Sequence, residues 1–362
     1  MSFIKTISLS VLVAIAGIGT CAAQVKLDGP PKIAFIYVSP ADDGGWSTSH
    51  DRGRQALEQA TGFPTAFTES VPEEKSKVRQ VIDAYASRGF NIIIGTSFGY
   101  GDAFQEAAKD YPNVAMMNVA GDTQAPNLES FFPRTYQAMY LAGMVAASMS
   151  KTDTIARVDG FPVPVANWDA NAFARGAQAV KPNIKVIITY INSWYDPVKE
   201  DQAADAMIEQ GADVILAGLS AAEVVEAEKK GVYSIGTQVD MSAQAPKGHL
   251  VSTVFAWDKY EAPLVQSIVK GTWKSAGTPL IGMETGIVDL SPFNPIVPEE
   301  VRQKVAAARQ AMIDGKLTPF DGPVYRQDGS LVVPEGRSMT DDELWHMTYL
   351  VKGITGSMPK QP

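Results

Sequence analysis

The stretch QVIDAYASRGFNIIIGT at residues 80–96 has a counterpart in ADAMIEQGADVILAG at residues 204–218. In each stretch a helical segment ends near a glycine, Gly89 or Gly211, and a short run rich in isoleucine or valine follows. Glycine commonly closes a helix because it adopts the left-handed backbone conformation without strain. A continuous apolar run, rather than an alternating one, is typical of a strand buried on both faces of a parallel sheet. The repeat therefore predicts two similar halves, each built on a parallel sheet.

The same alternation of strands and helices runs through most of the chain. We expect strands at residues 32–38, 91–94, 114–119, 154–158, 185–190, 213–217 and 233–236. We expect helices at residues 49–60, 74–88, 103–109, 137–150, 171–179, 200–210 and 221–229. The tail is less regular and rich in proline, with helices expected at 298–315 and 341–349 and a short hairpin around 328–329. This order of elements predicts an α/β fold.

The two halves are expected to form two doubly wound parallel-sheet lobes around a ligand cleft. Ligands of open α/β sheets bind beyond the carboxyl ends of the strands. Two such sheets that meet along those ends would enclose a cleft, and a cleft between hinged lobes can close.

The charge of the chain argues against a nucleic-acid partner. With 31 lysines and arginines against 40 aspartates and glutamates, the net charge of the 362 residues is −9. Such a chain repels phosphate backbones, and it has no basic cluster to offset the repulsion. We therefore expect no nucleic acid among its partners.

Residues 1–23 have the features of a secretory signal peptide. Lys5 precedes an apolar run at residues 7–18, and Cys21-Ala22-Ala23 supplies the small residues of a cleavage site before Gln24. The run is too short to span a membrane. The alternative is a lipoprotein anchor at Cys21, but the threonine before it fits a lipidation motif poorly. Cleavage would remove the only cysteine and leave a secreted chain without disulfides.

One motif suggests an enzyme. Gly95-Thr96-Ser97-Phe98-Gly99 matches the G-x-S-x-G pattern of serine hydrolases. A hydrolase also needs a histidine, and neither His249 nor His346 lies where a strand runs into a loop. Small residues are also common where strands of α/β folds end, because the chain turns tightly there. We expect no catalytic residue, with a secreted serine hydrolase using Ser97 as the alternative.

Other cofactor and metal motifs are absent from the sequence. The segment at residues 99–104 is an incomplete dinucleotide fingerprint, and no Walker loop or clustered set of cysteine and histidine ligands occurs. We therefore expect no cofactor and no metal site.

Aromatic and polar side chains follow several predicted strands, at the edge where the cleft is expected. They are Asp43, Trp46, Ser97, Phe98, Gly99, Asn167, Trp168, Trp194, Asp196, Gln238 and Asp240. We place all of them in loops that face the cleft. Flat apolar rings with amide and carboxylate neighbours suit a planar ligand that forms hydrogen bonds, such as a nucleobase.

The chain also resembles a known family over nearly its whole mature length. The matching motifs, in chain order, are residues 43–46 (DGGW), 93–99 (IIGTSFG), 107–112 (AAKDYP), 140–143 (YLAG), 192–197 (NSWYDP), 210–214 (QGADV), 235–236 (IG) with Asp240, and 351–356 (VKGITG). They are similar to the basic membrane protein (BMP) family of substrate-binding proteins of ABC importers, whose known members are purine nucleoside receptors.

The resemblance implies a fold, a ligand and a partner. The fold is that of a type I periplasmic binding protein, with an N-terminal lobe at residues 24–132 and 254–286 and a C-terminal lobe at 133–253 and 287–362. The ligand is a small planar heterocycle such as adenine, guanine or hypoxanthine, and the partner is an ABC importer permease in the inner membrane. The protein would be a periplasmic monomer without catalytic activity. A ligand-sensing subunit of a membrane receptor is a further alternative, since the same fold would serve it.

The family pattern also implies how the ligand is held. The aromatic clamp on the purine falls at Trp46 and Trp194. Two charged contacts of the family to ribose fall at Gln238 and Phe255, and a family aspartate is replaced by Ala120. A site that keeps its aromatic plates and loses these charges is expected to prefer a free base to a nucleoside. Phe255 is expected to fill part of the volume of the sugar.

Overall fold

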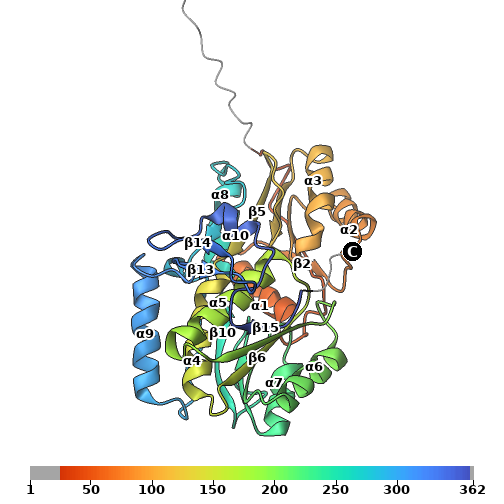
Figure 1. Ribbon diagram of the computed structural model, residues 1–362. Helices are drawn as coiled ribbons and strands as arrows, with labels where there is room; N and C mark the ends of the chain where they lie inside the picture. The colour runs from red at the N-terminus through yellow and green to blue at the C-terminus, as the bar shows by residue number, and fades with distance from the viewer. Residues whose placement is uncertain (1–24, 359–362) are drawn as a thin grey trace, which may run out of the picture.

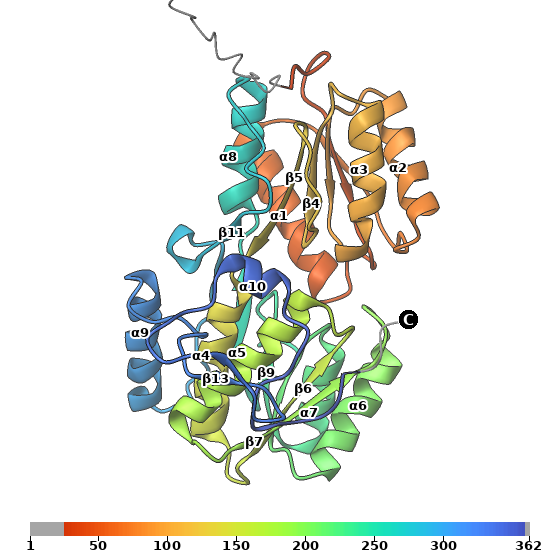
Figure 2. The same cartoon turned by 45° about the horizontal axis from the view of Figure 1, so that its top comes forward.

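The computed structural model describes residues 25–358. The predicted signal peptide at residues 1–23, including Cys21, lies outside the described residues. Two α/β lobes stand one above the other and are most clearly separated in Figure 2. No helix between residues 25 and 358 is both long and apolar enough to cross a membrane.

The first lobe is built on a six-stranded parallel sheet of order β11-β5-β4-β3-β1-β2. Its strands are β1 (Ile33–Ile36), β2 (Thr65–Thr68), β3 (Ile92–Gly95), β4 (Ala115–Val119), β5 (Leu128–Pro133) and β11 (Leu280–Ile281). Its helices are α1 (Trp46–Thr61), α2 (Lys75–Ser87), η1 (Phe98–Tyr100), α3 (Gly101–Asp110) and α8 (Asp258–Val269). Alternate residues of β1 face opposite layers: Ile33 and Phe35 pack in the same core as α1 and α8, and Ala34 and Ile36 pack with α2 and α3.

The second lobe is built on a seven-stranded sheet of order β12-β10-β9-β8-β6-β7-β15. Its strands are β6 (Thr154–Asp159), β7 (Lys185–Tyr190), β8 (Val214–Leu216), β9 (Tyr233–Gly236), β10 (His249–Phe255), β12 (Val288–Leu290) and β15 (Ile354–Thr355). Only β12 pairs antiparallel to its neighbour. The order β7-β6-β8-β9-β10 repeats the order β2-β1-β3-β4-β5 of the first lobe, so the predicted pair of similar parallel-sheet halves is confirmed.

Helices cover both faces of the second sheet (Figure 1). They are α4 (Thr135–Met149), α5 (Pro164–Val180), α6 (Pro197–Glu209), α7 (Ala222–Lys230) and α9 (Glu299–Ile313). Helices α4 and α5 pack tightly against each other: a Cβ on Gly143 would lie 2.0 Å from the Phe173 carbonyl oxygen, and one on Gly176 would lie 1.9 Å from that of Tyr140. Glycine is therefore required at both positions.

The chain passes between the lobes three times. It leaves the first lobe between β5 and α4, returns between β10 and α8, and leaves again through η2 (Met283–Thr285), between β11 and β12. The tail adds a hairpin of β13 (Val324–Tyr325) and β14 (Leu331–Val333) around Gly329, and the short helix α10 (Asp341–Trp345). Thr340 and Glu343 form a capping box at the start of α10.

The sequence-based prediction missed some elements. β2 is a half-exposed edge strand, and β5 carries buried Glu129 and Ser130 within an apolar segment, so neither shows a continuous apolar run. The placement of five site residues in loops is wrong, because Trp46 begins α1, Phe98 and Gly99 lie in η1, and Asn167 and Trp168 lie in α5. Helix α5 begins at Pro164, seven residues before the predicted start, because Asn167 and Asn171, although weak helix formers, are buried and hydrogen-bonded to the tail.

Candidate functional site

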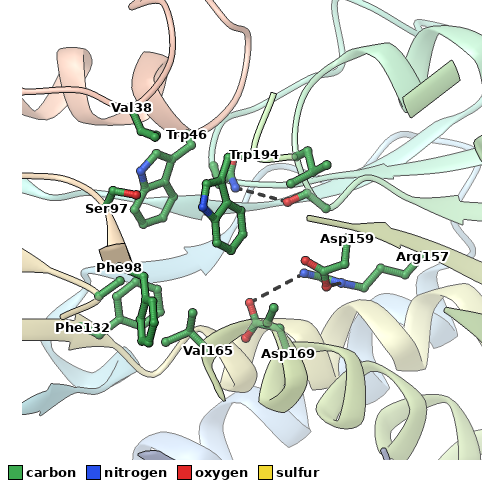
Figure 3. A pocket seen from close by; sticks show the side chains of 15 residues that line it. Val38, Trp46, Ser97, Phe98, Phe132, Arg157, Asp159, Val165, Asp169 and Trp194 are labelled. Carbon is green, nitrogen blue, oxygen red and sulfur yellow. Dashed lines mark hydrogen bonds and ion pairs between the residues drawn. The ribbon is translucent and has the colours of Figure 1, made fainter. Parts of the chain in front are cut away.

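A cavity lies between the two lobes, at the carboxyl ends of both sheets. Its empty space is about 630 Å³, including the part that opens to solvent, within the range of roughly 300–1000 Å³ typical of small-molecule sites. The first lobe contributes Val38, Trp46, Ser97, Phe98, Ala120 and Phe132. The second lobe contributes Arg157, Asp159, Val165, Ala166, Asp169, Trp194, Gly218, Leu219 and Gln238. Figure 3 shows this space bounded by aromatic rings on one side and by charged side chains on the other.

Trp46 is the aromatic wall of the first lobe and the first residue of α1. Its indole Nε1 donates a hydrogen bond to the Thr96 carbonyl oxygen, at 2.6 Å. Its ring stacks on Phe132 with 6.1 Å between ring centroids and meets Trp257 edge-on at 5.4 Å. These contacts fix the indole before any ligand binds.

Trp194 is the aromatic wall of the second lobe and follows β7. Its ring meets Phe161 edge-on, with 5.0 Å between centroids. It also lies directly against Gly160, where a Cβ would come within 2.6 Å of the indole Cε3. Its Nε1 donates a hydrogen bond across the cleft to Glu73 Oε2, at 2.9 Å.

Glu73 joins the two lobes and was not predicted as a site residue. It lies in the loop between β2 and α2, where no sequence pattern singles it out. Its Oε1 accepts hydrogen bonds from Ser97 Oγ at 2.5 Å and from the Gly99 backbone N–H at 2.7 Å, both within the first lobe. Its Oε2 accepts the bond from Trp194 in the second lobe. One carboxylate therefore connects the lobes beside the cavity.

Close backbone contact also joins the lobes at the start of α1. A Cβ on Gly45 would lie 2.2 Å from the Leu219 carbonyl oxygen and 2.8 Å from Gln238 Oε1. Gln238 has a left-handed backbone, with φ of 68°, and its Oε1 is buried without a hydrogen-bond partner among the described residues. The structure therefore has its lobes in contact around the cavity.

The charged end of the cavity is formed by Arg157, Asp159 and Asp169, none of which was predicted. Arg157 and Asp159 lie on β6, and the side chain of each is 3% exposed. The Arg157 Nε donates a hydrogen bond to Asp159 Oδ2 at 2.7 Å. Asp169 Oδ2 lies 4.0 Å from Arg157 Nη2. Burial raises the pKa of Asp169 to about 7, although the Arg157 guanidinium opposes the shift. Burial likewise raises the pKa of Asp159 against the opposing effect of Arg157. The sequence feature that could have indicated these site residues is Arg157, a charged residue inside a strand predicted to be buried.

Of the eleven predicted site residues, Trp46, Ser97, Phe98, Trp194 and Gln238 line the cavity. The others do not, and several of them stabilise local structure. Asp43 accepts hydrogen bonds from the backbone N–H groups of Gly45, Ser47 and Thr48 at the start of α1. Asp196 caps α6 through the Lys199 backbone N–H. Gly99 is held by Glu73, and Asp240 is exposed and accepts from the Ser242 backbone N–H.

Asn167 and Trp168 are fully buried on α5, away from the cavity lining. The Asn167 amide donates to the carbonyl oxygens of Pro162 and Met347. Phe255 also lies outside the cavity lining, with its ring edge-on to Trp257. The expectation that Phe255 fills the volume of a sugar therefore has no support in the structure.

Ser97 is not paired with a histidine in the described part of the chain. Its hydroxyl donates to Glu73. Among the described residues His50 is buried without a hydrogen-bond partner, His249 Nε2 bonds Ser252 Oγ, and His346 Nδ1 bonds the Asp342 carbonyl oxygen. Within residues 25–358, no group of three or more potential metal ligands is arranged to hold an ion. The cavity has the features of a binding site for a small molecule with apolar faces and a polar edge.

Comparison with known proteins agrees with this geometry. Residues 31–318 match the Bmp family model, described as ABC transporter substrate-binding protein, PnrA-like. A purine-binding protein of Brucella abortus is 34% identical over 94% of this chain and 97% of its own length. A putative ABC transporter glucose-binding protein of Haloferax volcanii is 32% identical over 90% of this chain and 81% of its own length. A solved ABC transporter solute-binding protein of Aeropyrum pernix has a TM-score of 0.71 at 18% identity, over 81% of this chain and 94% of that one.

Proposed function

This chain belongs to the Bmp family of PnrA-like ABC transporter substrate-binding proteins, and on that premise we propose that it binds a purine base between its lobes and presents it to an importer permease. The observation that carries the ligand proposal is the pair Trp46 and Trp194. They line one cavity from opposite lobes, and each indole N–H is already bonded to protein. Their ring faces are what remains for a ligand, and flat apolar faces favour stacking on an aromatic ring.

A bound base would be enclosed between the two lobes. The contacts from Glu73 to Trp194 and from Gly45 to Leu219 connect the lobes on the rim of the cavity. They form only when the lobes meet, so a ligand that favours the closed form shifts the population toward it. The permease would then recognise the closed form.

The distribution of polar groups favours a free base over a nucleoside. The charged groups lie together at one end of the cavity, and Ser97 is already bonded to Glu73. Most of the remaining lining is apolar, apart from the Gln238 amide. A base concentrates its hydrogen-bonding atoms on its edge, which suits one polar end. A nucleoside adds hydroxyls, and each one buried without a partner costs roughly 1–3 kcal/mol.

The test starts with the purified protein. Denaturing it and identifying the released small molecule by mass spectrometry names a retained ligand directly. Isothermal titration of ligand-free protein then compares adenine, guanine and hypoxanthine with their nucleosides. Glucose is the informative competitor, because a relative is named for it. We expect at least one base to bind tighter than its nucleoside by about tenfold, or 1.4 kcal/mol. Binding of glucose alone would overturn the purine proposal, and tighter binding of the nucleosides would overturn the preference for a base.

The location and the partner have their own tests. We place the mature protein in the periplasm, and N-terminal sequencing of the secreted protein is expected to begin at Gln24. Incorporation of labelled palmitate would instead indicate the lipid anchor at Cys21. Loss of purine-base uptake on deletion of the gene supports the importer. Unchanged uptake with loss of a purine response would support a sensing subunit.

A further inference from the structure

We propose that Asp169 selects the ligand through one oxygen, Oδ2, which accepts a hydrogen bond from an N–H donor on the ligand edge beside Arg157. This inference rests on the proposed function, because it takes the cavity between the lobes as the ligand site. It assigns ligand recognition to Asp169, and it assigns the direction of the Asp169 hydrogen bond to Thr135 and Trp168.

A chain of buried hydrogen bonds fixes the role of the other oxygen, Oδ1. Trp168 Nε1 lies 3.1 Å from Thr135 Oγ1, and Thr135 Oγ1 lies 2.6 Å from Asp169 Oδ1. Trp168 and Thr135 are fully buried. An indole N–H can only donate, and an ionised carboxylate can only accept, so the Thr135 hydroxyl accepts from Trp168 and donates its own proton to Asp169. Oδ1 is therefore an acceptor from Thr135 whenever Asp169 is ionised.

The second carboxylate oxygen of Asp169, Oδ2, is available for a hydrogen bond with a ligand. Within residues 25–358, Asp169 Oδ2 has no hydrogen bond, and its nearest charged partner is Arg157 Nη2 at 4.0 Å, too far for a direct bond. Arg157 directs Nε to Asp159 and Nη1 to Met139 Sδ. An acceptor, Asp169 Oδ2, and a donor, Arg157 Nη2, therefore lie side by side at the wall of the cavity (Figure 3).

This pair matches a heterocycle edge on which an N–H donor is adjacent to an acceptor. Adenine carries its 6-amino group next to ring nitrogen acceptors. Unsubstituted purine has the same ring nitrogens without the amino group. Purine keeps one imidazole N–H, but with its six-membered ring turned to Oδ2 in the orientation of adenine it places no donor there. The carboxylate then loses its hydrogen-bond partner in a water-poor site, so an acceptor at Oδ2 that faces the amino group favours adenine over purine.

Asp169→Asn gives a directional test, because the relay determines which way the amide points. Thr135 donates to whichever atom takes the place of Oδ1, so the amide oxygen occupies that position and Nδ2 faces the cavity as a donor. We expect adenine binding to weaken roughly 10- to 100-fold while purine binds as tightly as before or tighter. The titrations are run at about pH 8, where an acid whose pKa is about 7 is mostly ionised.

A second variant distinguishes positioning from simple damage. In Asp169→Asn combined with the isosteric Thr135→Val, the hydroxyl proton that holds the amide oxygen in place is removed. The amide can then turn its oxygen to the cavity, and part of the lost adenine affinity is expected to return. Melting temperatures of both variants show that they are folded.

Four outcomes decide the inference. Selective loss of adenine binding in Asp169→Asn, with partial recovery in the double variant, supports it. Equal loss for adenine and purine, no loss, or no recovery in a folded double variant overturns it. If the wild type binds no purine base at all, the proposed function fails instead.

Discussion

Replacing Trp194 with phenylalanine isolates the bond that crosses the cleft. Phenylalanine keeps a smaller aromatic face toward the ligand and removes the donor that reaches Glu73 Oε2 at 2.9 Å. A hydrogen bond to a charged group contributes roughly 1.5–3 kcal/mol. Because Glu73 is half-buried, water partly replaces the lost donor. We therefore expect a loss of about 1–2 kcal/mol in binding, or about five- to thirty-fold in Kd.

A double-mutant cycle separates this bond from the change in ring size. Titrations with the identified ligand compare the wild type, Trp194→Phe, Glu73→Gln and the double variant. The smaller ring of Trp194→Phe has the same effect on binding whether residue 73 is Glu or Gln, so this effect cancels in the cycle. The coupling energy therefore reports the interaction between Glu73 and Trp194. The matched control is Trp273→Phe, which removes an indole bond to Glu129 within the first lobe and is expected to leave Kd unchanged. Additive effects, within about 0.5 kcal/mol, would refute the role of this bond in closure.

Three further predictions follow from the same structure. Trp46→Ala should weaken ligand binding about 10- to 100-fold in isothermal titration, because stacking on a base contributes roughly 1–3 kcal/mol; wild-type affinity would show that this ring does not stack on the ligand. Gly45→Ala places a Cβ 2.2 Å from the Leu219 carbonyl oxygen, so small-angle scattering should show less compaction with ligand than in the wild type, and equal compaction would contradict the contact. Burial raises the pKa of Glu261 from 4.5 to about 8, and neither carboxylate oxygen has a hydrogen-bond partner among residues 25–358. Between these two pKa values the folded state holds a proton that the unfolded chain releases. The stabilisation from this group is therefore complete below about pH 4.5 and is lost as pH rises through 8. The free energy of unfolding changes by about 1.4 kcal/mol for each unit of the pKa difference. Glu261→Gln should reduce the difference in melting temperature between about pH 5 and pH 8; an unchanged difference would mean that another group causes it.

The predicted site residues that line the cavity include three aromatic side chains that follow the end of a strand. Trp46, Phe98 and Trp194 reach the cavity because the carboxyl ends of parallel strands share one edge of each sheet. The prediction for Trp168 failed because its position after a predicted strand and the polar residues beside it suggested a loop. These polar side chains are instead satisfied by buried partners on α4, β7 and the tail, and such long-range bonds have no local signature.

The sequence by itself determined the α/β class and the pair of similar halves. Both depend on local patterns that a short window of residues contains: a helix that ends at a glycine, and a strand that is buried on both faces. Only the tertiary structure decided which charges enter the cavity and how the lobes meet. Arg157 and Asp169 come from a strand and a helix of one lobe, and Glu73 and Trp194 come from loops of different lobes. Their contacts depend on how the helices pack on the sheets and how the lobes close, and these arrangements are set by packing between residues far apart in the chain.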